Sequence, residues 1–147
     1  MSFNLTEIHE VLNNLQGTEP IDISHAEMLQ KQPLRGADII TEYLGKIVKT
    51  VGYLETKVNS LKNKVSLEYQ ATEGRTTTDM KIWAGNASPE VEEVQIKLAK
   101  AKASKIVLEK KYDLLIKMHH YVKDIATGMK RNMPNGSGSN IQVAEGW

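Results

Sequence analysis

The sequence predicts an all-α fold: a long, coiled-coil-like antiparallel helical hairpin with short N-terminal helices and a flexible C-terminal tail, assembled into an oligomer. The first observation behind this prediction is that apolar residues recur in steps of four and three along two long stretches, a heptad pattern. The second is that only a short break around Gly74-Arg75 separates these stretches. Two long helices joined by a short connection fold back on each other.

The composition fits a single soluble domain of 147 residues. Because the chain has no cysteine, disulfides and thiolate metal clusters are excluded. The N-terminal residues lack the basic and apolar regions of a secretory signal, and no apolar run approaches the length of a membrane span. We therefore expect a cytoplasmic protein that has no contact with a membrane.

Two start signals predict the short helices of an N-terminal arm over residues 1–36. Asn4 and Glu7 have the spacing of a capping box, and helical apolar spacing follows as far as Gly17. Ser24 and Glu27 form a second such box, which predicts a short helix that ends before Pro33.

The long hairpin is predicted over residues 37–132. Its first helix runs to about Thr72, with seam residues at Ile40, Leu44, Ile47, Val51, Leu54, Val58, Leu61 and Val65. Thr76 and Asp79 mark a short helical segment after the break. The return helix begins with Ser88 as N-cap and Pro89 at its first position.

The heptad of the return helix continues from residue 91 to residue 129, and two of its seam positions are polar, Lys105 and His119. We expect the helix to fray near residues 128–132, before Pro134. The remaining residues, 133–147, form a Gly/Ser-rich tail that ends in a small apolar tip. This tip is either a disordered end or a docking peptide anchored by Trp147.

The return helix carries a second apolar stripe outside its seam, and this stripe predicts an oligomer. One hairpin contact cannot cover both stripes, and at about 25 cal/mol per Å² an uncovered stripe leaves several kcal/mol of burial unused. The alternative is that the N-terminal helices cover the stripe within one chain. The predicted oligomer interface is Leu114, Met118, Tyr121 and Ile125.

Enzymatic chemistry finds no support in the residue patterns. The "EGRTTT" segment lacks the second glycine, the lysine and the preceding strand of a phosphate loop. His119 and His120 are adjacent and point about 100° apart on a helix, so they cannot share one metal. The helix dipole explains the acidic residues that follow Pro89. We expect no catalytic residue, no metal and no cofactor.

The distribution of charge is more informative than its total. Residues 1–36 carry a net charge of −3, residues 37–132 a net charge of +5 and the tail −1. Basic residues gather around the break, which also holds Tyr69 and Trp83, and a further row follows the return helix at Lys97, Lys100, Lys102, Lys105, Lys110 and Lys111. Cations beside aromatic rings suit a single-stranded nucleic acid, whereas the alternative is the solvated flank of a coiled coil. The candidate nucleic-acid-binding residues are Lys57, Lys62, Lys64, Tyr69, Arg75 and Lys81.

The segment "LKNKVSLEYQATEG", residues 61–74, resembles the UvsY-type phage recombination mediators. These mediators have a basic helix end, a Leu-acid-Tyr triplet, a glycine turn, an acid-Met-Lys stretch and a long helix. In this chain Leu67-Glu68-Tyr69 matches the triplet, Gly74 the turn and Asp79-Met80-Lys81 the stretch. The organisation is similar over residues 20–132, while the specific motif covers about twenty residues.

The resemblance implies a non-enzymatic helical protein that forms rings, binds single-stranded DNA and helps a recombinase displace the single-strand-binding protein. A phage-encoded protein of this kind would work in the host cytoplasm. In the family a lysine and an arginine, two residues apart, contribute to DNA binding before the triplet. Lys64 matches the lysine, but Ser66 stands at the arginine position, and Lys62 or Arg75 could compensate.

Two other classes of protein remain open from the sequence. One is a non-catalytic structural or scaffolding coiled-coil protein that binds only proteins. The other is a small adaptor that acts beside a helicase or a nuclease. Salt-dependent binding to oligonucleotides separates the mediator from the scaffold, and binding to a recombinase separates the mediator from the adaptor.

Overall fold

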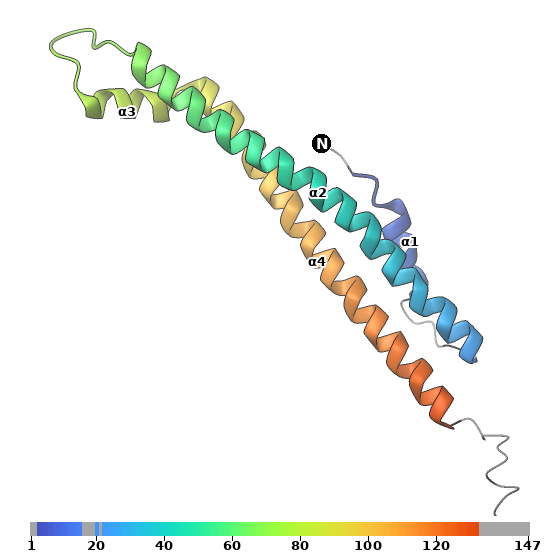
Figure 1. Ribbon diagram of the computed structural model, residues 1–147. Helices are drawn as coiled ribbons and strands as arrows, with labels where there is room; N and C mark the ends of the chain where they lie inside the picture. Colours follow the sequence, from blue (N-terminus) through green and yellow to red (C-terminus); the bar gives the residue numbers. More distant parts are fainter. Residues whose placement is uncertain (1–2, 16–19, 21, 133–147) are drawn as a thin grey trace, which may run out of the picture. The chain divides into compact units, whose positions relative to one another are not determined.

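The computed structural model describes residues 3–15, 20 and 22–132. It confirms the predicted all-α helical hairpin: the described residues contain no strand and form four helices (Figure 1). These are α1 (Thr6–Leu15), α2 (Ile23–Glu68), α3 (Thr78–Ala87) and α4 (Pro89–Asn132). The predicted tail, like the predicted end of the first helix at Gly17, lies outside the described residues.

The described residues divide into two compact units, and each long helix contributes to both of them. Unit 1 contains Phe3 and residues 40–111, which include α3 and the break between the long helices. Unit 2 contains α1, the beginning of α2 and the second half of α4, up to residue 132.

Helix α1 in unit 2 begins at Thr6, two residues after Asn4, the first predicted capping residue. The Asn4 side-chain oxygen accepts a hydrogen bond from the Thr6 amide at 3.1 Å, which satisfies one of the free N–H groups of the first turn. The apolar face of α1 is buried through Ile8, Val11 and Leu12. An ion pair of 2.7 Å between Glu7 and Arg35 connects α1 with α2.

The prediction of a separate short helix before Pro33 is wrong. Helix α2 begins at Ile23 and continues through Pro33 without a break. Its first turn is capped by Asp22, whose carboxylate accepts from the His25 amide at 2.7 Å, so that Ser24 is not the capping residue.

Tertiary packing accounts for a proline inside a helix. Pro33 is fully buried in unit 2. Because proline has no backbone N–H group, Pro33 donates no helical hydrogen bond to the carbonyl of Leu29, four residues earlier. One residue further on, the carbonyl of Gln30 accepts a hydrogen bond from His119 Nδ1 of α4 at 3.0 Å. The polar seam residue His119 therefore supplies a donor from the opposite helix beside the proline.

The contacts in unit 2 show that α2 and α4 are antiparallel there. Glu27 pairs with Lys130 at 2.6 Å, and Gln30 accepts from His119. Further along α2, a Cβ atom at Gly36 would lie 3.1 Å from the side chain of Leu115. The buried apolar side chains that α2 and α4 contribute to this core are Ala26, Leu29, Ala37, Leu115, Val122 and Ala126.

The heptad seams of unit 1 also pack as predicted. Every predicted seam residue of α2 and α4 is buried or half-buried. Val58 packs with Val91 and Val94, and Leu54, Leu61 and Leu98 surround this cluster. Lys105 occupies its seam position half-buried and lies 3.6 Å from Glu109.

The break between the long helices is a turn closed by glycine and threonine. α2 ends at Glu68, a few residues before the predicted end. Gly74 has a φ of 76°, which favours glycine, so the predicted glycine turn is confirmed. Thr76 does not cap α3 as predicted, because its hydroxyl accepts from the Ala71 amide; Thr77 caps α3 by accepting from the Met80 amide at 3.2 Å. Ser88 and Pro89 begin α4 as predicted.

Candidate nucleic-acid interface

The six residues predicted to bind nucleic acid all lie in unit 1, but they do not share one exposed surface. Lys57 and Lys64 on α2 and Arg75 in the turn are exposed. The other three, Lys62, Tyr69 and Lys81, are half-buried. The exposed residues are thus the ones most available to a ligand.

The packing of α3 against the end of α2 explains this division (Figure 1). Ser66 donates a hydrogen bond of 2.8 Å to the carbonyl of Lys81. A Cβ atom at Gly85 would lie 2.8 Å from Ser66 Oγ and 2.9 Å from the carbonyl of Lys62. The face of α2 that bears Lys62 and Ser66, one turn apart, therefore contacts α3.

This packing bears on the position that the family resemblance assigns to an arginine. Ser66 is half-buried and its hydroxyl holds the backbone of α3. At this position the chain therefore has no basic side chain that could contact a ligand. Lys64 lies two residues away, about 200° around the helix, and is exposed.

The exposed face of α2 in unit 1 carries a row of lysines, which we call the lysine stripe. At about 100° per residue, its members fall within an arc of about 80° and extend over about 27 Å of helix. Four of the five lysines between residues 40 and 68 belong to it. The stripe comprises Lys46, Lys49, Tyr53, Lys57 and Lys64, and all five side chains are exposed.

An aromatic ring lies in the middle of the stripe. Tyr53 is 64% exposed, and the Lys57 ammonium lies 6.0 Å from the centroid of its ring. Lys46 pairs with Glu42 at 2.8 Å, whereas Lys49 and Lys64 have no carboxylate within ion-pair distance among the described residues. The sequence prediction missed Lys46, Lys49 and Tyr53, although their spacing of three and four residues places them on one helix face.

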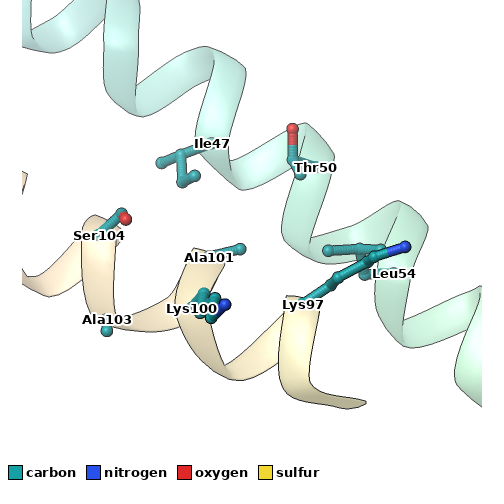
Figure 2. A pocket seen from close by; sticks show the side chains of 8 residues that line it. All are labelled: Ile47, Thr50, Leu54, Lys97, Lys100, Ala101, Ala103 and Ser104. Carbon is teal, nitrogen blue, oxygen red and sulfur yellow. The ribbon is translucent and has the colours of Figure 1, made fainter. Parts of the chain in front are cut away.

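A groove of about 630 Å³ lies beside the stripe, between α2 and α4 of unit 1 (Figure 2). We call it the hairpin groove. Small side chains leave it open: Ala101 and Ser104 of α4 lie across from larger residues of α2. Lys97 extends from α4 toward Leu54 in Figure 2. The residues that line the groove are Ile47, Thr50, Leu54, Lys97, Lys100, Ala101, Ala103 and Ser104.

The stripe and the groove share a flank of unit 1, because Thr50 of the groove lies four residues after Lys46 and three before Tyr53 on α2. Lys97 hydrogen-bonds to Glu93 at 2.8 Å, and this bond and the ammonium charge lower the pKa of the Glu93 carboxyl. The charge of Lys57 also lowers the pKa of the Glu93 carboxyl. Thr50, a groove residue, lies one turn from Lys46 and donates to its carbonyl at 3.1 Å.

The other flank of unit 1 has a different character. A smaller hollow of about 290 Å³ is lined there by Glu55, Val58, Asn59 and Leu98. Glu55 forms an ion pair of 2.8 Å with Lys102, which neutralises this cation. A polyanion would therefore meet an acid and a neutral amide on this flank, but the unpaired Lys49 and Lys64 on the stripe.

The predicted oligomer interface lies on α4 of unit 2. Tyr121 is 67% exposed and Leu114 is 40% exposed, while Met118 and Ile125 are half-buried. An ion pair between Glu7 and Arg35 connects α1 with α2. Leu114 and Tyr121 of the predicted oligomer interface remain open to solvent. In unit 1, α4 exposes further apolar side chains at Ile96, Ile106 and Val107.

Residues 3–15, 20 and 22–132 contain no group of three His, Cys, Asp or Glu side chains placed to hold a metal ion. In the same ranges, no helix is both long enough and apolar enough to cross a membrane.

Comparison of the chain with protein-family models, with curated proteins and with solved structures gave no match. The likeness to UvsY-type mediators therefore rests on the motif of residues 61–74 and on the helical organisation around it.

Proposed function

We propose that this protein is a recombination mediator of the phage type. It binds single-stranded DNA as a homo-oligomer and helps to load a recombinase onto DNA that is coated with single-strand-binding protein. The protein partners are the recombinase, the single-strand-binding protein and further copies of this chain, and the site of action is the cytoplasm of the host. The protein performs no covalent chemistry and requires no cofactor.

The observation that carries this proposal is the exposed basic surface leading into the bend of the hairpin. Lys57 and Lys64 are exposed two turns apart on one face of α2, and Arg75 is exposed in the turn that follows. Trp83 on α3 is 66% exposed. Cations that contact phosphates and aromatic faces that stack on bases are the two components of sequence-independent single-strand binding.

The mechanism is electrostatic and geometric. Each subunit offers a small number of lysine–phosphate contacts, which are individually weak in salt. An oligomer repeats these contacts, so one strand bound to several subunits gains avidity without any new type of contact. Holding the strand in this way lowers the cost of exchanging one coating protein for another.

Replacing Lys57 and Lys64 together by alanine is expected to reduce recombinase loading. The measurement is the rate of recombinase assembly on single-stranded DNA that is coated with single-strand-binding protein. Removal of two phosphate contacts lowers the affinity for the strand and reduces the slope of log K against log salt by about 1.4. Since both side chains are exposed, the helix content measured by circular dichroism should not change.

Lys62→Ala is the matched control, because this lysine is half-buried beside α3. We expect its effect on loading to be smaller than that of Lys64→Ala alone. The proposal is wrong if the wild-type protein neither binds single-stranded DNA nor accelerates recombinase assembly.

The scaffolding alternative is favoured by a different observation, the exposed apolar side chains of α4. A protein that binds only other proteins would use these side chains and leave the lysine stripe in solvent. Oligonucleotide binding that is absent even at low salt, together with intact binding to a protein partner, would support the scaffold instead of the mediator.

The exposed face of α4 is also the proposed contact between subunits. Leu114→Glu is expected to weaken self-association by at least about tenfold, because a buried leucine contributes roughly 1.5–3 kcal/mol and a carboxylate is costly to bury. Leu34→Glu on α2 is the matched control, since Leu34 is 41% exposed and Leu114 is 40% exposed. Sedimentation velocity measures the assembly, and a wild-type monomer at micromolar concentration would contradict the proposal.

A further inference from the structure

The flank of unit 1 away from the bend carries two features that the proposed site does not use. The lysine stripe begins at Lys46, about six helical turns before the end of α2. The hairpin groove lies beside its first half, around Thr50 and Leu54. Neither the family motif nor the bend accounts for these features.

We infer that the lysine stripe and the hairpin groove together form a track for single-stranded DNA along this flank, with Tyr53 as a platform on which a base stacks. This inference rests on the proposed function and specifies which surface of unit 1 holds the strand. The phosphates contact the lysines of the stripe and Lys100 on the opposite lip of the groove, and the groove receives the bases.

Charge gives the first argument for this track. Lys49, Lys64 and Lys100 have no carboxylate partner within ion-pair distance in the described ranges. Their charges are therefore free to replace the counterions of a phosphate backbone. The opposite flank presents Glu55, already paired with Lys102, and Asn59. Within unit 1 the stripe is thus the face that attracts a polyanion.

The position of the aromatic ring gives the second argument. Tyr53 is 64% exposed, whereas tyrosine side chains in folded proteins are usually more buried. Lys57 lies 6.0 Å from the ring centroid, so a phosphate held by Lys57 brings its own base close to the ring. Stacking on tyrosine is tolerant of sequence, as single-strand binding requires.

The shape of the groove gives the third argument. Its floor is formed by small or apolar side chains, including Ala101 and Leu54, and its α4 lip carries Lys97 and Lys100. Lys97 is paired with Glu93, so Lys100 is the cation of this lip that lacks an acidic partner. Bases are apolar on their faces and phosphates are anionic, which matches an apolar floor between two cationic lips.

The test compares variants that remove equal charge from different faces. The stripe variant is Lys49→Ala/Lys64→Ala, and the control is Lys102→Ala/Lys110→Ala, whose side chains are exposed on α4. Fluorescence anisotropy of a labelled oligo-dT measures binding between low and moderate salt. We expect the stripe variant to lose about 1.4 from the slope of log K against log salt and Lys100→Ala to lose about 0.7, while the control keeps the wild-type slope.

Substitution of Tyr53 distinguishes a track for DNA from a generic cationic surface. Tyr53→Ala is expected to weaken oligo-dT binding by about 5- to 150-fold, the range for loss of one base–aromatic stack. Tyr53→Phe keeps the ring and should bind like the wild type. Binding of heparin, a polyanion without bases, should respond to the stripe variant but not to Tyr53→Ala.

The outcomes separate this inference from the function on which it rests. If the wild type binds oligo-dT but the stripe and control variants lose the same slope, the track is overturned together with the contact at Lys64, and Arg75 and Trp83 at the bend remain the candidates. If Tyr53→Ala binds oligo-dT like the wild type, the stacking platform is overturned. If the wild type does not bind oligo-dT at low salt, both the track and the proposed function are wrong.

Discussion

Leu108→Ala is expected to destabilise the protein by about 2–5 kcal/mol. Leu108 lies on the seam of α4 in unit 1 and is 1% exposed. Its truncation removes apolar contacts and leaves a cavity between helices that cannot fully collapse. A loss of this size is a large part of the roughly 5–15 kcal/mol that stabilise a domain. Urea denaturation followed by circular dichroism measures the effect.

The control for this variant is the same substitution on an exposed leucine of the same unit. Leu67 is 79% exposed near the end of α2, so Leu67→Ala should change the free energy of unfolding by no more than about 0.5 kcal/mol. Equal effects of the two substitutions would mean that the heptad seam is not the core of unit 1.

Two substitutions of glycine by alanine are expected to act in opposite directions. At Gly85 a Cβ atom would lie 2.9 Å from the carbonyl of Lys62, and this backbone atom cannot move without shifting α2. We expect Gly85→Ala to cost about 1–3 kcal/mol. At Gly52 nothing lies within 4 Å of the added Cβ, so Gly52→Ala should stabilise the helix by about 0.5–1 kcal/mol.

Trp83 provides the local measurement for Gly85→Ala, because it lies on α3 two residues before the substitution. In a Trp147→Phe background its fluorescence reports α3 alone. Displacement of α3 would also break the hydrogen bond between Ser66 and Lys81. Stabilisation by both substitutions would contradict the close packing of α3 on α2.

The features that depend on local pattern were predictable from the sequence. Heptad spacing defined both seams, and the residues of these seams are buried or half-buried in both units. The start of α4 was also predictable, because Ser88 and Pro89 act within one helical turn. Gly74 fulfilled its predicted role because a positive φ strongly favours glycine.

The features that depend on tertiary contacts were not predictable. Pro33 continues a helix because α2 is packed in unit 2, where His119 reaches the Gln30 carbonyl. Lys62 was grouped with Lys64 because the two are close in sequence, yet α3 occupies the face of α2 that bears Lys62. The packing position of α3 depends on Gly85, and no local pattern indicates it.

The lysine stripe was missed for another reason. Its members are spread over nineteen positions, from Lys46 to Lys64, so they do not form a cluster along the chain. Sorting the same residues by angle around the helix brings them together on one face. A search by helix face would have found the stripe from the sequence, but the hairpin groove requires knowledge of how α2 and α4 pack.

The central claim is that the basic flank of unit 1 contacts a single strand, and photocrosslinking tests it most directly. An oligonucleotide that contains 5-iodouracil, which reacts with aromatic side chains that stack on it, is irradiated with the full chain, and the linked peptides are mapped. The expected result is a crosslink at Tyr53, reduced by added salt and abolished by Tyr53→Ala/Lys57→Ala/Lys64→Ala. Crosslinks confined to Tyr121 of unit 2, or none at all in dilute buffer, would contradict the claim.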